Sequence, residues 1–198
     1  MRFGPLTIGF DERVLTPRPW TVRQSEWGAW LLDELPPGPV LELCCGAGQI
    51  GLLATYGSDR ALVQVDRSEA ACAWAAENAA RAGRETDVRK ASLEDALEAD
   101  ERFALVLADP PWVPHDAIAR YPEDPPEAID GGEDGLDLAR QCVGVVARHL
   151  LPGGRAILQL GTEAQLVALR PAVREAGLRV VAQQVVAPRG GVLLQLGS

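Results

Sequence analysis

The chain has 198 residues, of which 47% are hydrophobic and 24% charged, and its formal net charge is −9. This length predicts a single globular domain, and the acidic balance disfavours bulk binding to nucleic-acid phosphates. The amino-terminal residues lack the apolar stretch of a signal peptide, and no apolar run is long enough to cross a bilayer, so we expect a cytoplasmic protein.

Alternating strands and helices are predicted from about residue 22 onward. Residues 1–20 carry Gly and Pro without periodic apolar positions, which predicts an irregular lead-in with one short strand. The elements expected next are a helix over 22–35, a strand over 40–43, a helix from about residue 50, a strand over 61–65, a helix over 69–82 and a strand over 86–90.

The second half of the chain continues this alternation and ends in two strands. The expected elements are a strand over 103–108, a loop over 110–135, a helix over 136–151, a strand over 156–160, a helix over 164–176, and strands over 178–186 and 192–196 joined by a hairpin-like return at 188–191. The pattern predicts an α/β fold: a Rossmann-like, seven-stranded, mostly parallel sheet with one antiparallel edge strand and helices on both faces. We expect residues 1–35 to pack on the same domain as the cofactor-binding residues 36–198.

A glycine-rich turn follows the strand over 40–43. Gly46 and Gly48 allow the backbone to turn tightly and to approach a ligand, and Gly51 completes a GxGxxG pattern between a strand and a helix. The next strand ends in Asp66, whose carboxylate can accept hydrogen bonds from both hydroxyls of a ribose. Together these features predict a site for an adenosine-containing cofactor; the alternative is a plain tight turn with Asp66 as a helix cap.

The acidic residue Glu42 distinguishes between two such cofactors. A carboxylate at the start of the turn would repel the pyrophosphate of NAD, whereas it suits the positive sulfonium of S-adenosylmethionine, which is therefore the expected cofactor. Ser92 and Leu93 are expected beside the adenine ring, and Cys44 and Arg67 complete the predicted cofactor-binding residues. No metal site is predicted, because the four cysteines lack the spacing of zinc ligands.

The sequence Asp109-Pro-Pro-Trp112 follows the strand over 103–108, where sheets of this kind bind ligands. We predict that the Asp109 side chain and the Pro110 carbonyl accept hydrogen bonds from an NH2 group on a planar π system, which orients its lone pair toward a methyl donor. Pro110 and Pro111 stiffen the loop, and Trp112 offers a flat face for stacking. These four are the predicted catalytic residues, with Asp109 also beside the cofactor.

Four stretches of the chain carry a recognisable pattern: residues 14–19 (VLTPRP), 42–48 (ELCCGAG), 109–112 (DPPW) and 124–137 (DPPEAIDGGEDGLD). Together they resemble the class I S-adenosylmethionine-dependent methyltransferases, and more closely the HemK/PrmC group. Members of that group methylate the side-chain nitrogen of a glutamine in protein release factors. The resemblance implies the same fold and cofactor and a protein glutamine as acceptor, with Arg18, Pro19 and Trp112 as substrate-binding residues. A surface ion pair is the alternative for Arg18.

The chain departs from the pattern of that group at several points. Asp109 stands where the group has Asn, and a carboxylate only accepts hydrogen bonds whereas an amide also donates them. Cys44 replaces a glycine, Trp20 replaces a glutamate, and nothing in the sequence corresponds to the helical N-terminal domain of bacterial members. A partner subunit that recognises the acceptor is one hypothesis for such a chain.

Four functions are compatible with these sequence features to different degrees. N-methylation of a protein glutamine is the leading one. The second is N-methylation of an exocyclic amine of RNA, DNA or a small metabolite, which Asp109 favours and the net charge disfavours for large nucleic acids. An NAD-dependent oxidoreductase would need a catalytic Tyr–Lys or similar pair near the nicotinamide. It is disfavoured, because Lys90 is the only lysine and Tyr56 and Tyr121 are the only tyrosines. A non-catalytic scaffold is disfavoured, because the cofactor turn and Asp109 are both retained.

Overall fold

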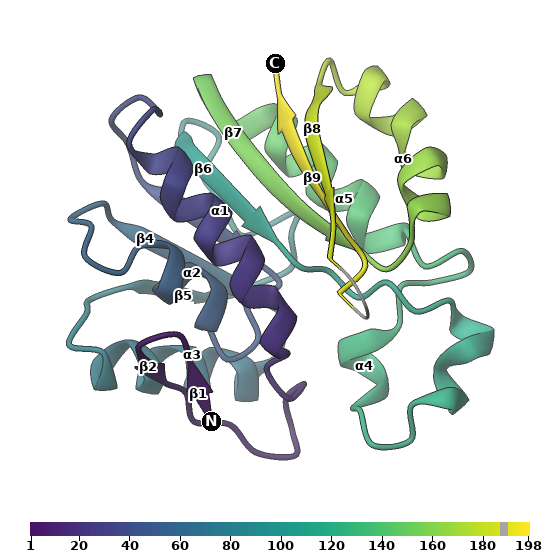
Figure 1. The fold of residues 1–198 in the computed structure, drawn as a ribbon, viewed down its shortest axis with the longest axis horizontal. Coiled ribbons are helices and arrows are strands. Elements are labelled where there is room, and N and C mark those ends of the chain that lie inside the picture. The colour runs from purple at the N-terminus through teal and green to yellow at the C-terminus, as the bar shows by residue number, and fades with distance from the viewer. Residues whose placement is uncertain (187–189) are drawn as a thin grey trace.

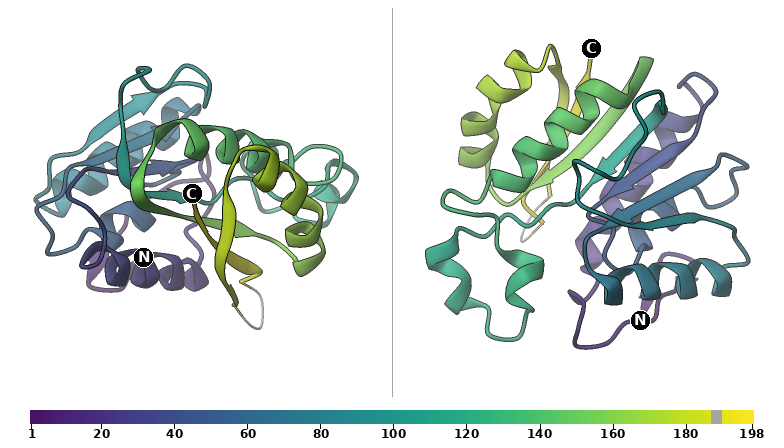
Figure 2. Two further views of the ribbon diagram at one scale, coloured as in Figure 1. Left: turned by 90° about the horizontal axis from the view of Figure 1, so that it is seen from above. Right: turned by 180° about the vertical axis from the view of Figure 1, so that it is seen from behind.

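The computed structural model describes residues 1–186 and 190–198. Its centre is a seven-stranded sheet with helices on both faces (Figures 1 and 2). The strands follow one another across the sheet in the order β5 (Asp87–Lys90), β4 (Leu62–Asp66), β3 (Val40–Leu43), β6 (Phe103–Ala108), β7 (Leu150–Leu160), β9 (Val192–Gly197) and β8 (Arg179–Val185).

The sheet is mostly parallel, which confirms the predicted fold class. Strands β5, β4, β3, β6 and β7 pair in parallel, and β9 runs antiparallel to both of its neighbours. This antiparallel strand lies one place inside the edge, because the chain passes from α6 to the outer strand β8 before β9 returns between β7 and β8. Residues 187–189 of the predicted hairpin-like return lie outside the described residues.

Helices cover the two faces of the sheet in separate groups. The buried core divides into two clusters, one on each face of the sheet. One cluster contains residues of α1 (Val22–Leu32), α2 (Gln49–Ala54) and α3 (Glu69–Arg81), and the other contains residues of α5 (Asp137–His149) and α6 (Glu163–Glu175). Neighbouring residues of a strand belong to opposite clusters, as the period of two requires: Leu105 faces the first group of helices and Val106 the second. In the described residues, no helix combines the length and apolarity needed to span a membrane.

The structure differs from the sequence predictions around residues 150–155. The helix predicted over 136–151 ends at His149, and β7 begins at Leu150 instead of residue 156. The predicted Pro-Gly-Gly stop lies inside this strand, because an irregularity in the β6–β7 pairing accommodates it: Phe103 pairs with Leu150, but Leu105 pairs with Arg155.

The two segments predicted to be irregular contain short elements. The lead-in holds two short strands, β1 (Arg2–Phe3) and β2 (Leu6–Thr7), and a 3-10 helix, η1 (Pro19–Thr21). The predicted loop over 110–135 contains a 3-10 helix, η2 (His115–Arg120), and a short helix, α4 (Pro126–Ile129). In Figure 1 the lobe that carries α4 stands beside the carboxyl ends of the parallel strands.

Candidate cofactor and acceptor site

A cavity of about 1280 Å³ opens where β3, β4 and β6 end. The lead-in, the turn after β3, the segment after β5 and the α4 lobe contribute to its walls. The predicted site residues that line it are Arg18, Cys44, Gly46, Asp66, Arg67, Ser92, Leu93, Asp109 and Pro111. The predicted residues that are not on its wall are Pro19, Glu42, Gly48, Pro110 and Trp112.

Gly46 and Gly48 have different structural roles in the turn. Gly48 has a φ of 78°, and a Cβ there would lie 2.6 Å from Gln64 Nε2 and 3.0 Å from Ala75 Cβ, so this glycine lets the turn pack onto the sheet and α3. Gly46 has a φ of 52°, and a Cβ there would have no neighbour within 4 Å. The space over Gly46 is therefore open to a ligand.

Cys44 adopts the left-handed conformation that glycine favours. Its φ is 56°, and it is the one non-glycine residue with a positive φ in the part of the chain that the structure describes. Its contact with the Cys142 thiol, together with burial, raises the pKa of the Cys44 thiol well above its ordinary value. Cys44 is therefore protonated at neutral pH and offers no thiolate nucleophile.

Asp66 lies where β4 ends, with its carboxylate facing the glycine turn. Its Oδ2 accepts a hydrogen bond of 2.9 Å from the backbone N–H of Gly46, and its Oδ1 accepts one of 2.9 Å from that of Ser68. Each oxygen keeps a further lone pair. The side chain is thus fixed in place and can still accept from two hydroxyls of a ribose.

Glu42, which was predicted to bind the cofactor, does not line the cavity. Its side chain points beneath the turn and is 1% exposed. Its Oε2 accepts a hydrogen bond of 2.7 Å from Gln64 Nε2, and a Cβ at Gly51 would lie 2.5 Å from that oxygen. Burial raises the pKa of Glu42 to about 7. The alternation along β3 explains this direction, because residue 42 faces α2 and not the opening.

Asp109 presents its carboxyl group to the cavity directly after β6. Among the described residues it has no hydrogen-bond partner, although Arg18 lies near enough for its charge to act on it. Loss of hydration raises the pKa of Asp109 to about 7, and the Arg18 charge opposes this rise. Arg18 itself forms an ion pair with the buried carboxylate of Asp124.

Trp112, Pro110 and Pro19 do not line the cavity. The Trp112 ring packs against Gly161, where a Cβ would lie 2.2 Å from it, and its carbonyl accepts a hydrogen bond of 2.8 Å from Gln165 Nε2. Pro110 is buried, and Pro19 begins η1. The chain direction at the end of β6 thus turns Asp109 and Pro111 toward the cavity and Trp112 toward α6.

Two buried amides that the sequence analysis did not select hold the site together. Gln24 on α1 donates hydrogen bonds of 3.0 Å to the carbonyls of Ala108 and Ile157, which fixes the end of β6. Asn78 on α3 donates to the carbonyls of Gly9 and Ala47 and accepts from the Gly9 N–H, which ties the lead-in to the glycine turn. The sequence feature that could have identified them was a polar amide on the apolar face of each predicted helix.

The α4 lobe is attached to the body by polar contacts around the cavity. Arg67 donates a hydrogen bond of 2.8 Å to the carbonyl of Glu127, and Arg18 pairs with Asp124. His115 Nδ1 lies 2.9 Å from an oxygen of Asp130, and the imidazole side chain is 75% exposed. These contacts close one wall of the cavity while leaving His115 in solvent.

Several known proteins match this sequence. A family model described as "Methyltransferase small domain" matches residues 28–121. A release factor glutamine methyltransferase of Mycolicibacterium smegmatis is 35% identical over 165 residues, which are 79% of this chain and 57% of that protein. A ribosomal protein uL3 glutamine methyltransferase of Bradyrhizobium diazoefficiens is 34% identical over 172 residues, which are 79% of this chain and 54% of that protein.

Solved structures share the fold at lower identity. A ribosomal protein L11 methylase from Lactobacillus delbrueckii subsp. bulgaricus gives a TM-score of 0.69 at 17% identity, covering 95% of this chain and 83% of that chain. A methyltransferase from Pyrococcus furiosus gives 0.67 at 18% identity, covering 98% of this chain and 88% of that chain. At these identities the similarity shows that the fold is shared and nothing more.

In its fold and in the sequence of its glycine turn, this chain is similar to the methyltransferases that it matches. Within them, its sequence is similar to the glutamine methyltransferases of release factors and of ribosomal protein uL3. The chain spans just over half the length of these curated relatives.

Proposed function

We propose that this protein transfers a methyl group from S-adenosylmethionine to a planar amide nitrogen, with a protein glutamine side chain as the first acceptor. One observation carries the proposal: the Asp109 carboxyl, free of protein hydrogen bonds, faces the same cavity as Gly46 and Asp66. The proposed adenosine site and the carboxyl group proposed to hold the N–H of the methyl acceptor therefore lie in one cavity.

The residues of the cavity fit S-adenosylmethionine. Asp66 would hold the ribose, the open backbone at Gly46 would admit the ligand, and Ser92 and Leu93 would flank the adenine. Seven acidic and three basic residues line the cavity, which favours a cationic ligand over a pyrophosphate. When bound, S-adenosylmethionine supplies an electrophilic methyl group on a good leaving group.

Asp109 would orient the acceptor nitrogen. In its neutral form the carboxyl group donates one hydrogen bond and accepts another, which complements the C=O and N–H of a carboxamide. A pKa of about 7 makes this form abundant at neutral pH. Holding the nitrogen in this way lowers the entropic part of the barrier for a weak nucleophile.

An exocyclic amine is the second candidate acceptor. An ionised Asp109 accepts only, and two N–H groups of a base or metabolite amine need only acceptors. The same raised pKa leaves this form abundant above neutral pH. The direction of the pH dependence therefore separates the two acceptors.

Calorimetric titration tests the cofactor part of this proposal. We expect S-adenosylmethionine and S-adenosylhomocysteine to bind and NAD not to bind. Asp66→Ala removes both ribose contacts and is expected to weaken binding at least about a hundredfold, whereas Asp66→Asn keeps one acceptor oxygen and should be intermediate. Thermal unfolding of each variant controls for lost structure, because Asp66 also accepts from Gly46 and Ser68. Tight NAD binding would overturn the proposal.

A further inference from the structure

A second cavity lies between α6 and the edge strand β8. Its volume is about 430 Å³, and its walls come from Arg170, Val173 and Arg174 of α6 and from residues 179–183 at the start of β8. None of these residues lines the cavity at the glycine turn. The two cavities are therefore separate sites.

Three arginines face this groove without carboxylate partners. Arg170, Arg174 and Arg179 are exposed, and across residues 1–186 and 190–198 none of them forms an ion pair. The contacts of Arg170 with Gln183 Oε1 and of Arg179 with the Ser198 carbonyl are long, at 3.5 Å and 3.3 Å. Each guanidinium group therefore keeps N–H donors that can bind an anion.

The strand that forms the other wall has a free edge. β8 pairs with β9 on one side and ends the sheet on the other. Val181 and Val185 on this strand are 42% and 58% exposed. An edge strand with exposed valines is a template for pairing with another extended chain.

We propose that the groove between α6 and β8 binds an extended acidic polypeptide segment, which adds to the edge of β8 and places carboxylates against Arg170, Arg174 and Arg179. Carboxylates complement the arginines, backbone groups complement the strand edge, and apolar side chains complement the valines. RNA would complement only the arginines, and it would match neither the strand edge nor the valines. The whole chain has a net charge of −9, which repels a long polyanion more strongly than a short peptide.

Binding of a defined peptide tests this proposal on the full chain. The probe is a fluorescent, end-capped peptide of alternating Glu and Thr, with a Lys–Thr peptide and a single-stranded RNA oligonucleotide as competitors. The test variant is the double substitution Arg170→Gln with Arg174→Gln. Arg148→Gln is the matched control, because Arg148 is exposed on α5 and lies outside the groove. Hydrogen exchange of residues 179–185 reports whether the strand edge is occupied.

We expect saturable binding of the Glu–Thr peptide, protection of residues 179–185 from exchange, and a loss of about tenfold in affinity for the double variant. Arg148→Gln should bind as the unsubstituted protein does. Failure of the peptide to bind, binding that the double variant leaves unchanged, binding without protection of β8, or stronger binding of RNA would each overturn the proposal.

Discussion

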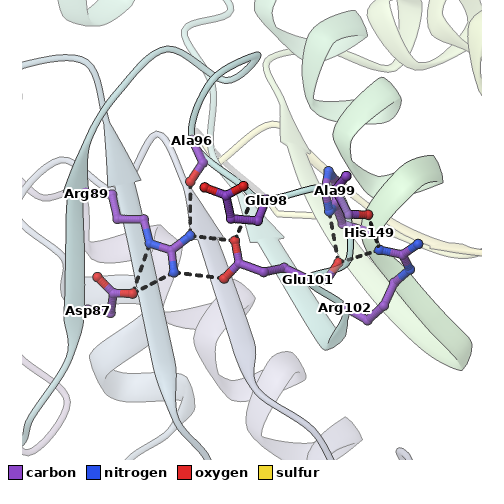
Figure 3. Close-up of polar contacts among 8 residues, drawn as sticks. All are labelled: Asp87, Arg89, Ala96, Glu98, Ala99, Glu101, Arg102 and His149. Carbon is purple, nitrogen blue, oxygen red and sulfur yellow. Dashed lines mark hydrogen bonds and ion pairs between the residues drawn. The ribbon is translucent and has the colours of Figure 1, made fainter.

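The carboxylates of Glu101 and Asp87 converge on the Arg89 guanidinium (Figure 3), whereas those of Glu42 and Asp109 face no cation of the described residues at hydrogen-bond distance. Both Arg89–Glu101 hydrogen bonds measure 2.8 Å, and this pairing holds the pKa of Glu101 down to about 2. Burial instead raises the pKa of Glu42 and of Asp109 to about 7.

The difference separates carboxylates that a cation stabilises from carboxylates whose charge burial disfavours. Glu101 and Arg89 join the segment before β6 to β5, and His149 adds a hydrogen bond to the Glu101 carbonyl. Glu42 and Asp109 are kept in poorly hydrated places where their charge costs free energy. Strongly shifted carboxyl groups are more frequent at functional sites, and of these two only Asp109 lines the cavity.

The largest expected effect is on the pH dependence of catalysis. If neutral Asp109 holds a carboxamide, kcat/KM falls about tenfold per pH unit above about pH 7, because the carboxyl loses its donor proton. Asp109→Asn keeps a donor and an acceptor at every pH, so its profile should be flat in this range. A wild-type rate that rises with pH, together with an inactive Asp109→Asn, would favour the exocyclic amine instead.

Removing the paired charge of Glu101 and removing the buried charge of Glu42 should change stability in opposite directions. Because the folded pKa of Glu101 is lowered, its contribution is present above about pH 4.5 and is lost as pH falls through about 2. Glu101→Gln should lower the free energy of unfolding at pH 7 by about 1–2 kcal/mol, and by less at pH 2. Urea unfolding measures this, with Glu98→Gln as the control on an exposed neighbour.

Glu42→Gln should act in the other direction. The raised pKa of Glu42 means that its burial costs stability progressively as pH rises from about 4.5 through about 7. The neutral variant avoids this cost, so at pH 8 it should gain about 1–2 kcal/mol over the unsubstituted protein. A loss of stability at pH 8 would show that the ionised carboxylate holds the turn.

A smaller effect is expected at Cys44, whose φ of 56° is unfavourable for a side chain. Cys44→Gly and Cys44→Ala both remove the thiol, and only the alanine keeps a Cβ. The glycine variant should be more stable by about 1 kcal/mol. Thermal unfolding compares them, and equal melting temperatures would show that the turn relaxes around a Cβ.

The sheet and the cofactor turn could be predicted from the sequence because their signals are local. The buried run of β6, the glycines at 46 and 48, and Asp66 at the end of β4 each follow from period, turn chemistry or position. The start of β7 was missed, because a Pro-Gly-Gly run usually interrupts structure and only the pairing with β6 absorbs it.

Side-chain direction was the less predictable part of the site. Glu42 faces α2 and Trp112 packs on Gly161, and both outcomes depend on strand alternation and loop path at single positions. Gln24 and Asn78 bridge elements far apart in the chain, so their partners could not be read from neighbouring residues. Spacing places a residue near a site, whereas packing decides which way its side chain points.

The central claim is methyl transfer to an amide nitrogen held by Asp109. The most direct measurement incubates the protein with S-adenosylmethionine and glutamine-containing peptides from a release factor and from ribosomal protein uL3, and locates any added methyl group by mass spectrometry. The account predicts one methyl group on a glutamine side chain at neutral pH, and none with Asp109→Ala. Methylation that survives Asp109→Ala, or that appears on nucleoside amines and on neither peptide, would contradict it.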